Sequence, residues 1–162
     1  SEYDVSLKTG ASVLQALNQE HFEPRDLFVD RSGKWHLHGV GVDPERALRG
    51  VDVVFNAMHG EYGEDGEVQR LLDSLSIPYT GSDAIASQLA FNKLKTKEAA
   101  ARLGVQVPRH VVINPPTDDF PLEKKALHIF RTFPHPVIVK PMIGGSSVGM
   151  TLGRSKHRHK RW

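Results

Sequence analysis

The residues best suited to chemistry in this chain form a loop, His59–Gly66, which follows the apolar run Val53–Phe55. The loop contains three glycines, three carboxylates and one histidine. This composition predicts a tight turn at the carboxyl end of a buried strand, where open α/β sheets bind ligands. Glycine permits backbone conformations closed to other residues, and carboxylates are favourable just before a helix N-terminus. The alternative is an ordinary acidic turn on the surface.

A second group combines Lys140, at the end of the β-branched run Val137–Val139, with the glycine- and serine-rich loop Gly144–Gly149. A lysine charge and a concave set of backbone amides suit a polyphosphate. The lysine precedes the glycines, so the pattern is neither a Walker A loop nor a Rossmann fingerprint. The alternative is a strand lysine that reaches solvent beside a flexible hairpin loop.

The net charge of +2 comes from the last nine residues, Arg154–Trp162, which hold five basic side chains and no acid. Without them, 16 basic residues stand against 19 acidic ones. A basic tail can bind nucleic acid by neutralising phosphates. Nucleic-acid binding is nevertheless not favoured, because no basic surface with interleaved aromatic residues supports it elsewhere.

Composition narrows the class of protein. The 162 residues are 39% hydrophobic and 25% charged, which is typical of a globular chain of one domain or slightly more. Cysteine is absent, which excludes disulfides and thiolate chemistry. No apolar run approaches a membrane span and the start is not a signal peptide, so a cytoplasmic protein without membrane contact is predicted. The histidine pairs His36/His38 and His157/His159 lack acidic or cysteine partners at ligand spacing, so they are interpreted as surface residues and no metal site is predicted.

Strand and helix patterns alternate along the chain. Helices are predicted at about 9–19, 67–75, 93–103 and 121–133, and another after Ser82, which is expected to cap it. Strands are predicted at 27–29, 34–38, 51–58, 111–113 and 137–139, with a short extended segment at 78–81. This alternation predicts an α/β protein with much parallel pairing.

Several motifs occur together in a fixed order, and together they resemble the D-alanine–D-alanine ligase family over residues 1 to about 152. The matching segments are Ser1-Glu2-x-x-Val5-Ser6-x-x-x-Gly10, His59-Gly60-x-x-Gly63-Glu64-Asp65-Gly66, Pro78-Tyr79-Thr80-Gly81-Ser82, Asn92-Lys93 with Thr96-Lys97, Val139-Lys140-Pro141 and Gly145-Ser146-Ser147-Val148-Gly149.

The resemblance implies an ATP-grasp ligase of peptidoglycan precursor synthesis. ATP phosphorylates the carboxylate of one D-alanine, the amine of a second attacks the acyl phosphate, and phosphate leaves from a tetrahedral intermediate. The implied fold is an N-terminal open parallel-sheet, Rossmann-like (preATP-grasp) substrate domain at 1–87 and a truncated ATP-grasp domain at 88–152, before a non-family basic tail at 153–162. The family often dimerises through its N-terminal region, so the resemblance allows a homodimer without specifying one.

Site roles follow by position from the same resemblance. Glu2 would pair with the ammonium of the first D-alanine, His59 would lie beside the second, and Ser146 would help to hold the substrate, which makes Glu2 and Ser146 the catalytic pair. ATP phosphates would contact Lys93 and Lys140, with the loop Gly145–Gly149, including Ser147, closing over them. Fixed carboxylates suit an amino-acid ammonium, and cations placed in advance suit a transferring phosphate.

This sequence also departs from the family's pattern at both ends, and these departures lead to further expectations. The chain begins inside the family's opening motif, and after Gly153 it shows none of the family's adenine contacts or Mg²⁺ ligands, which are expected in a C-terminal region not included in this sequence. We therefore expect this chain alone to be inactive, because phosphoryl transfer depends on bridged phosphate charge. Two alternatives remain: a D-alanine–D-lactate type of ATP-grasp ligase, and a non-catalytic remnant whose basic tail binds nucleic acid.

Overall fold

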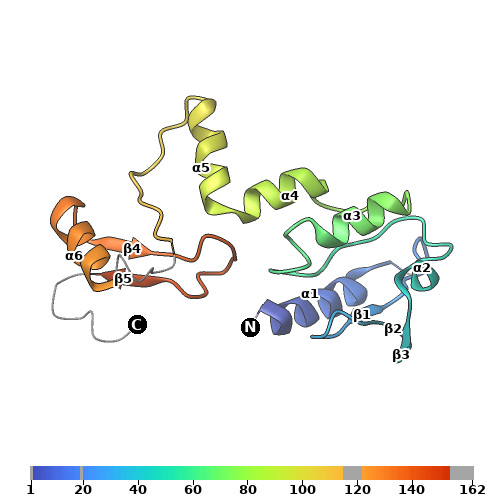
Figure 1. Ribbon diagram of the computed structural model, residues 1–162. Helices are drawn as coiled ribbons and strands as arrows, with labels where there is room; N and C mark the ends of the chain where they lie inside the picture. Colours follow the sequence, from blue (N-terminus) through green and yellow to red (C-terminus); the bar gives the residue numbers. More distant parts are fainter. Residues whose placement is uncertain (1, 19, 115–121, 154–162) are drawn as a thin grey trace. The chain divides into compact units, whose positions relative to one another are not determined.

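The computed structural model describes residues 2–18, 20–114 and 122–153 and divides into two compact units, residues 1–92 and 93–162 (Figure 1). The basic tail predicted at 153–162 lies outside the described residues except for Gly153. The roles predicted for residues 1–87 and 88–152 stay predictions, and the division observed here falls after Asn92.

Unit 1 begins with helix α1, Glu2–Ala16, so the helix predicted at 9–19 starts much earlier and ends sooner. Acidic Glu2 and Asp4 lie in its first turn, where the helix dipole favours negative charge. Ser6 Oγ donates to the Glu2 carbonyl at 3.0 Å, so its hydroxyl bonds within the helix instead of breaking it. The opening segment is therefore helical from Glu2 onward.

An antiparallel sheet of three short strands follows: β1 Leu27–Val29, β2 Trp35–Leu37 and β3 Val40–Val42, in the order β1-β2-β3. Val29 pairs with Trp35, and Trp35 with Val42. The first two strands agree with the predictions at 27–29 and 34–38, whereas β3 and the short helix α2, Pro44–Ala47, were not anticipated.

The segment predicted as a strand at 51–58 forms a parallel bridge between Val54 and Tyr79 instead of a full strand. The Val54 N–H donates to the Pro78 carbonyl at 2.8 Å, and the Thr80 N–H donates to the Val54 carbonyl at 3.0 Å. Helix α3, Glu67–Ser74, connects the two segments. Parallel pairing of the predicted kind therefore occurs where 51–58 meets 78–81.

Helix α4, Ala84–Phe91, is capped by Asp83, whose Oδ1 accepts the Ala86 N–H at 2.7 Å. The prediction that Ser82 caps this helix is wrong. The Ser82 carbonyl instead accepts the Ser87 hydroxyl, and Asp83 has the extended backbone that a capping residue adopts.

One hydrophobic core occupies unit 1. Trp35, Leu48 and Leu72 are at most 5% exposed, and Val68 and Ala47 complete the cluster. Partly buried residues of the sheet and of the 51–58 and 75–79 segments pack against it. The core therefore joins the antiparallel sheet to α2 and α3.

Unit 2 contains α5 Lys93–Arg102, α6 Leu122–Thr132 and a two-stranded antiparallel sheet of β4 Val137–Val139 with β5 Thr151–Gly153. Gly104, after α5, has the positive φ of 78° typical of a helix end. The strand predicted at 111–113 is not observed, and β4 pairs with β5.

The chain is an α/β protein, as predicted, although its named strand pairs are antiparallel. Over the described ranges, no helix has the length and apolar character needed to cross a bilayer.

Candidate functional site

The loop His59–Gly66 is a tight turn that leads directly into α3, as predicted, but the segment 51–58 before it is partly exposed and is not the predicted buried strand. Gly66 is the N-cap of α3 with φ 95°, and a Cβ there would lie 2.5 Å from the Ala84 carbonyl oxygen. Only glycine fits both the positive φ and the close backbone approach. The last glycine of the loop therefore fixes how the turn enters the helix.

Two carboxylates of the loop bond to its own backbone. Glu64 Oε2 accepts the Gly60 N–H at 2.7 Å, while the Glu64 N–H donates to the Gly60 carbonyl at 2.8 Å. Asp65 accepts the N–H groups of Tyr62, at 2.8 Å, and Glu67, at 3.0 Å. These carboxylates are therefore used to build the loop, which the composition alone did not reveal.

The His59 imidazole lies between α1 and the loop. Its Nε2 is 2.9 Å from Thr9 Oγ1, at hydrogen-bond distance, and its Nδ1 is 3.6 Å from Glu64 Oε1. The His59 N–H donates to Ser6 Oγ at 2.9 Å. Both the ring and the backbone of His59 are thus oriented by the first two turns of α1, and its side chain keeps 36% exposure.

The Glu2 side chain lies against Gly60. A Cβ built on Gly60 would be 2.2 Å from Glu2 Oε2 and 2.8 Å from Glu2 Cδ. The missing side chain of Gly60 therefore leaves the space that the Glu2 carboxylate occupies. The structure brings Glu2 and His59, two of the predicted substrate residues, to the same place, and their roles stay predictions.

The Gly63 carbonyl accepts hydrogen bonds from two side-chain amides, which sequence reasoning missed. Asn56 Nδ2 and Gln69 Nε2 both donate to it at 2.8 Å. The signal was a glutamine on the core-facing side of α3, next to Val68 and three residues before Leu72, where an apolar residue is expected.

A hydrogen bond links the loop to the core. Trp35 Nε1 donates to the Tyr62 hydroxyl at 3.0 Å, and Tyr62 packs against the core cluster. Tyr62 has φ 70°, a conformation unusual for a side chain larger than glycine. The contact with Trp35 helps to hold Tyr62 there.

In unit 2, Lys93 lies at the start of α5 and contacts the predicted phosphate loop. Its N–H donates to the Met142 carbonyl at 2.9 Å, and its Nζ donates to the Gly144 carbonyl at 2.6 Å. The ammonium group has three donors, so two remain for a further acceptor. The structure therefore brings Lys93 to this loop through a contact with the Gly144 carbonyl, and its role at the ATP phosphates stays a prediction.

The loop itself makes a tight turn at Gly145–Val148. The Val148 N–H donates to the Gly145 carbonyl at 3.1 Å, and Ser146 and Ser147 have φ of 44° and 60°. Two successive positive φ values define a type I′ turn, which favours Asn and Gly over serine. Both serines are exposed, and so is Lys140, which follows β4.

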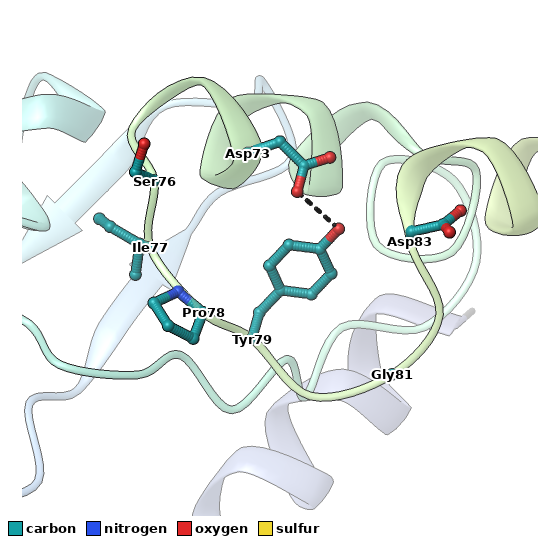
Figure 2. Close-up of a pocket in the computed structure, with 7 residues that line it drawn as sticks. All are labelled: Asp73, Ser76, Ile77, Pro78, Tyr79, Gly81 and Asp83. Atoms are coloured by element: carbon teal, nitrogen blue, oxygen red, sulfur yellow. Dashed lines mark hydrogen bonds between the residues drawn. The ribbon is translucent and has the colours of Figure 1, made fainter.

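A cavity of about 360 Å³ lies elsewhere in unit 1, lined by Asp73, Ser76, Ile77, Pro78, Tyr79, Gly81 and Asp83 (Figure 2). The Tyr79 hydroxyl points to Asp73 and donates to its Oδ1 at 2.9 Å. Burial, and secondly the Asp73 carboxylate, raise the pKa of Tyr79. None of the predicted site residues lines this cavity. We therefore interpret the Tyr79–Asp73 hydrogen bond as a contact that stabilises the 78–81 segment.

The prediction that His36 is a surface residue without an acidic partner is wrong. His36 is partly buried, and its Nε2 lies 2.9 Å from Asp30 Oδ2. Hydrogen bonds from the Ser32 hydroxyl first, then from His36 and the Lys34 N–H, lower the pKa of Asp30. The acid comes from the facing end of β1, which sequence spacing does not reveal. In the part of the chain that the structure describes, no cluster of three or more His, Cys, Asp or Glu could hold a metal ion.

Comparisons with known proteins agree on one family. A family model described as "D-ala D-ala ligase N-terminus" matches residues 38–82. A D-alanine–D-alanine ligase of Desulforamulus reducens is 37% identical over 161 residues, covering 98% of this chain and 48% of the relative. One of Hydrogenovibrio crunogenus is 41% identical over 150 residues, covering 93% and 43%.

The fold has solved counterparts. The crystal structure of the D-alanine–D-alanine ligase of Bacillus anthracis complexed with ATP matches with a TM-score of 0.70 and 28% identity, covering 96% of this chain and 47% of that one. The chain therefore spans about half the length of the curated relatives and solved structures that it matches.

Proposed function

We propose that this chain, which matches the N-terminal part of the D-alanine–D-alanine ligase family, provides the D-alanine-binding and ATP-phosphate-binding elements of such a ligase. Unit 1 contains Glu2 and His59, which would bind the amino-acid substrate, and unit 2 contains Ser146 together with the residues that would bind the ATP phosphates.

The reaction joins two D-alanines at the expense of ATP. The carboxylate of the first takes the γ-phosphoryl group and releases ADP. The amine of the second then attacks the acyl carbon, loses a proton, and expels phosphate from the tetrahedral intermediate. The protein contributes mainly by holding the substrates and stabilising charge.

The observation that carries the proposal is the Glu2 carboxylate, which lies against Gly60 beside His59. An amino-acid ammonium needs a fixed anion, and the Glu2 backbone is held by the Ser6 hydroxyl, which also accepts the His59 N–H. His59 is oriented by Thr9 and Glu64, so its ring is pre-positioned for a polar substrate group. This arrangement supports Glu2 and His59 as substrate-binding residues.

The phosphate side of the proposal rests on Lys93, Lys140 and the turn Gly145–Val148. Lys93 is fixed next to the loop by two bonds to its backbone, and Lys140 is exposed beyond β4. Ser146 and Ser147 hold strained positive φ angles, which occur preferentially at ligand-binding positions. Gly145, Ser146 and Ser147 would offer amides and hydroxyls to the phosphates, and Ser146 would also help to hold D-alanine.

The D-alanine site is tested by calorimetric titration of the 162-residue chain with D-alanine, with L-alanine as the stereochemical control. Glu2→Gln removes the anion and keeps the shape, and Glu20→Gln makes the same change at an exposed residue outside the helices. We expect Glu2→Gln to weaken D-alanine binding at least tenfold, as for the loss of a charge-assisted hydrogen bond of about 1.5–3 kcal/mol. Equal affinities of Glu2→Gln and Glu20→Gln would refute the assignment.

The phosphate site is tested with ATP. Lys140→Met should weaken ATP binding, whereas Lys124→Met, at an exposed position of α6, should leave it unchanged. The expectation from sequence that this chain alone is inactive is checked in the same samples. D-alanine-dependent ADP release above the level of a Lys140→Ala control would contradict it.

The proposal extends to three finer points. A cytoplasmic location follows because ATP is the phosphoryl donor. The second substrate, D-alanine or D-lactate, is decided by which of them yields product in the complete ligase. Mg²⁺ is the expected partner of the phosphates, and the described residues offer no cluster of three or more His, Cys, Asp or Glu that would hold it.

A further inference from the structure

The carbonyl oxygen of Gly63 is held by two side-chain amides that approach from the two sides of the loop. Asn56 precedes the loop and Gln69 lies in α3 after it, and each donates to this oxygen at 2.8 Å. A carbonyl has two lone pairs, so this acceptor is fully used. The middle of the loop is therefore tied to both of its ends.

The two amides differ in their other contacts. Asn56 Oδ1 accepts the Met58 N–H at 3.1 Å, so both ends of that amide are bonded. Gln69 is 4% exposed, and its Oε1 is buried without a hydrogen-bond partner among the described residues. Burial of an unpaired amide oxygen costs stability, so an apolar side chain would suit this core position of α3 better. The contact that an apolar side chain cannot replace is the bond to Gly63.

Gly63 is also confined by packing. A Cβ there would lie 2.5 Å from Met58 Cβ and 2.8 Å from the Met58 carbonyl carbon and oxygen. The glycine therefore packs directly on the segment that enters the loop. Its neighbour Glu64 closes the turn onto Gly60 and lies beside His59. The Gly63 carbonyl consequently constrains Glu64, whose Oε1 lies 3.6 Å from His59 Nδ1, while Ser6 and Thr9 hold His59 from α1.

We propose that Gln69 is a positioning residue, whose Nε2 holds the Gly63 carbonyl and thereby fixes the Gly60–Glu64 turn that presents His59 to the substrate. The claim that His59 faces a substrate rests on the proposed function. The claim that Gln69 fixes the turn rests on the hydrogen bonds alone. Gln69 itself acts through Gly63 and is not assigned a contact with D-alanine.

Gln69→Met in the full 162-residue chain is the direct test. The Gly63 carbonyl keeps its bond from Asn56, so no orphan acceptor is created and the fold should survive. Gln88→Met makes the same chemical change at an exposed position of α4 and is the matched control. Trp35 emission, in a Trp162→Phe background, monitors the fold of unit 1 in all variants.

The readouts are the hydrogen exchange of the Glu64 amide and the ¹⁵N resonances of the His59 imidazole. Gln69→Met is expected to speed Glu64 exchange about fivefold, the effect of one net hydrogen bond, and to shift or broaden the His59 resonances. Gln88→Met should change neither. Unchanged exchange and resonances in Gln69→Met, or a loss confined to the Trp35 unfolding midpoint, would overturn the proposal.

A second variant covers the case in which Gln69→Met does not fold. Gln69→Glu keeps the side-chain length and can donate to Gly63 only when its acid is protonated, which burial favours. Protection of the Glu64 amide should then fall as the pH is raised, with no such change in the parent chain. Protection that is independent of pH in this variant would also contradict the inference.

D-alanine titration separates this inference from the proposed function. If the parent chain binds D-alanine, Gln69→Met should weaken that affinity severalfold at an unchanged unfolding midpoint. If neither binds, the proposed function fails, while the exchange and imidazole readouts still decide whether Gln69 positions the loop.

Discussion

The two units hold their candidate site residues in different ways. In unit 1 the His59–Gly66 loop is connected to a buried core, because Tyr62 bonds to Trp35 and Gln69 lies between core residues of α3. In unit 2 every large apolar side chain of the described part is at least partly exposed, with Leu103 at 83% and Val148 at 64%. Its phosphate loop is held by a turn and by two bonds from Lys93.

This difference indicates how each region should respond to change. Residues tied to a core lose their positions only when packing or a buried hydrogen bond is lost, and the loss is felt across the unit. Residues held by local bonds respond to changes in those bonds alone. Substitutions in the core of unit 1 should therefore change stability most, and substitutions of single turn residues should change it least.

The largest effect is expected from Leu72→Ala, which removes a fully buried side chain of the core. It should lower the stability of unit 1 by about 2–5 kcal/mol, through lost transfer free energy and a cavity. Leu103→Ala, at an 83% exposed position of unit 2, should change stability by less than about 0.5 kcal/mol.

Urea unfolding followed by Trp35 emission in a Trp162→Phe background measures the change in unit 1, and far-UV circular dichroism of the same samples measures the change in the whole chain. Trp35 is 5% exposed and belongs to the core, so its emission reports on unit 1. Similar losses in the two variants would show that the contrast between the units is wrong.

Sequence patterns predicted the elements with strong local signals. The helices at 67–75 and 93–103 and the strand at 137–139 appear close to their predicted bounds, because apolar spacing and terminal glycines mark them. The first helix begins at Glu2 instead of about residue 9, and the helix dipole favours acidic Glu2 and Asp4 in this first turn. Strands β3 and β5 each contain a glycine among their three residues, and glycine is depleted in strands, so neither gives a strand signal.

Some features of the candidate site could likewise be predicted from the sequence, and others could not. The loop His59–Gly66 and the Lys140–Gly149 segment could be recognised from residue types and order. The bonds of Thr9 to His59 and of Gln69 to Gly63 could not, because they join segments whose relative placement depends on tertiary packing. The pairing of Asp30 with His36 could not be predicted for the same reason.

The second prediction compares two glycines of unit 1. Gly63→Ala should cost about 1–3 kcal/mol, because its Cβ would collide with the Met58 backbone and overpack the loop. Gly10→Ala should instead stabilise by about 0.5–1 kcal/mol, because Gly10 is helical and its Cβ would meet only Ala57 Cβ at 3.9 Å. Urea titration monitored by Trp35 gives both values, and effects of the same sign would contradict the assigned packing.

The third prediction concerns the turn of unit 2. Ser147→Gly should stabilise the Gly145–Val148 turn by about 1 kcal/mol, because it removes the left-handed strain of serine at φ 60°. Gly149→Ala should loosen it, since φ is 71° and a Cβ would lie 2.8 Å from Pro141 Cγ. Exchange of the Val148 amide should slow in the first variant and accelerate in the second. A change in the Trp35 unfolding midpoint would show that the turn is coupled to the core after all.

The smallest effect is expected at Asp30, an acid of the β1–β2 turn. Its folded-state pKa lies below the ordinary value, so ionised Asp30 stabilises the fold above the unfolded pKa of about 4. This contribution is lost as the pH falls toward the folded pKa. Asp30→Asn should therefore be less stable than the parent chain at pH 7, and the gap should close on acidification. Ser32→Ala removes the largest cause of the lowered pKa and should show a smaller gap of the same form. A gap between Asp30→Asn and the parent that is the same at pH 7 and pH 3, measured by urea unfolding, would mean that these hydrogen bonds do not depend on the charge of Asp30.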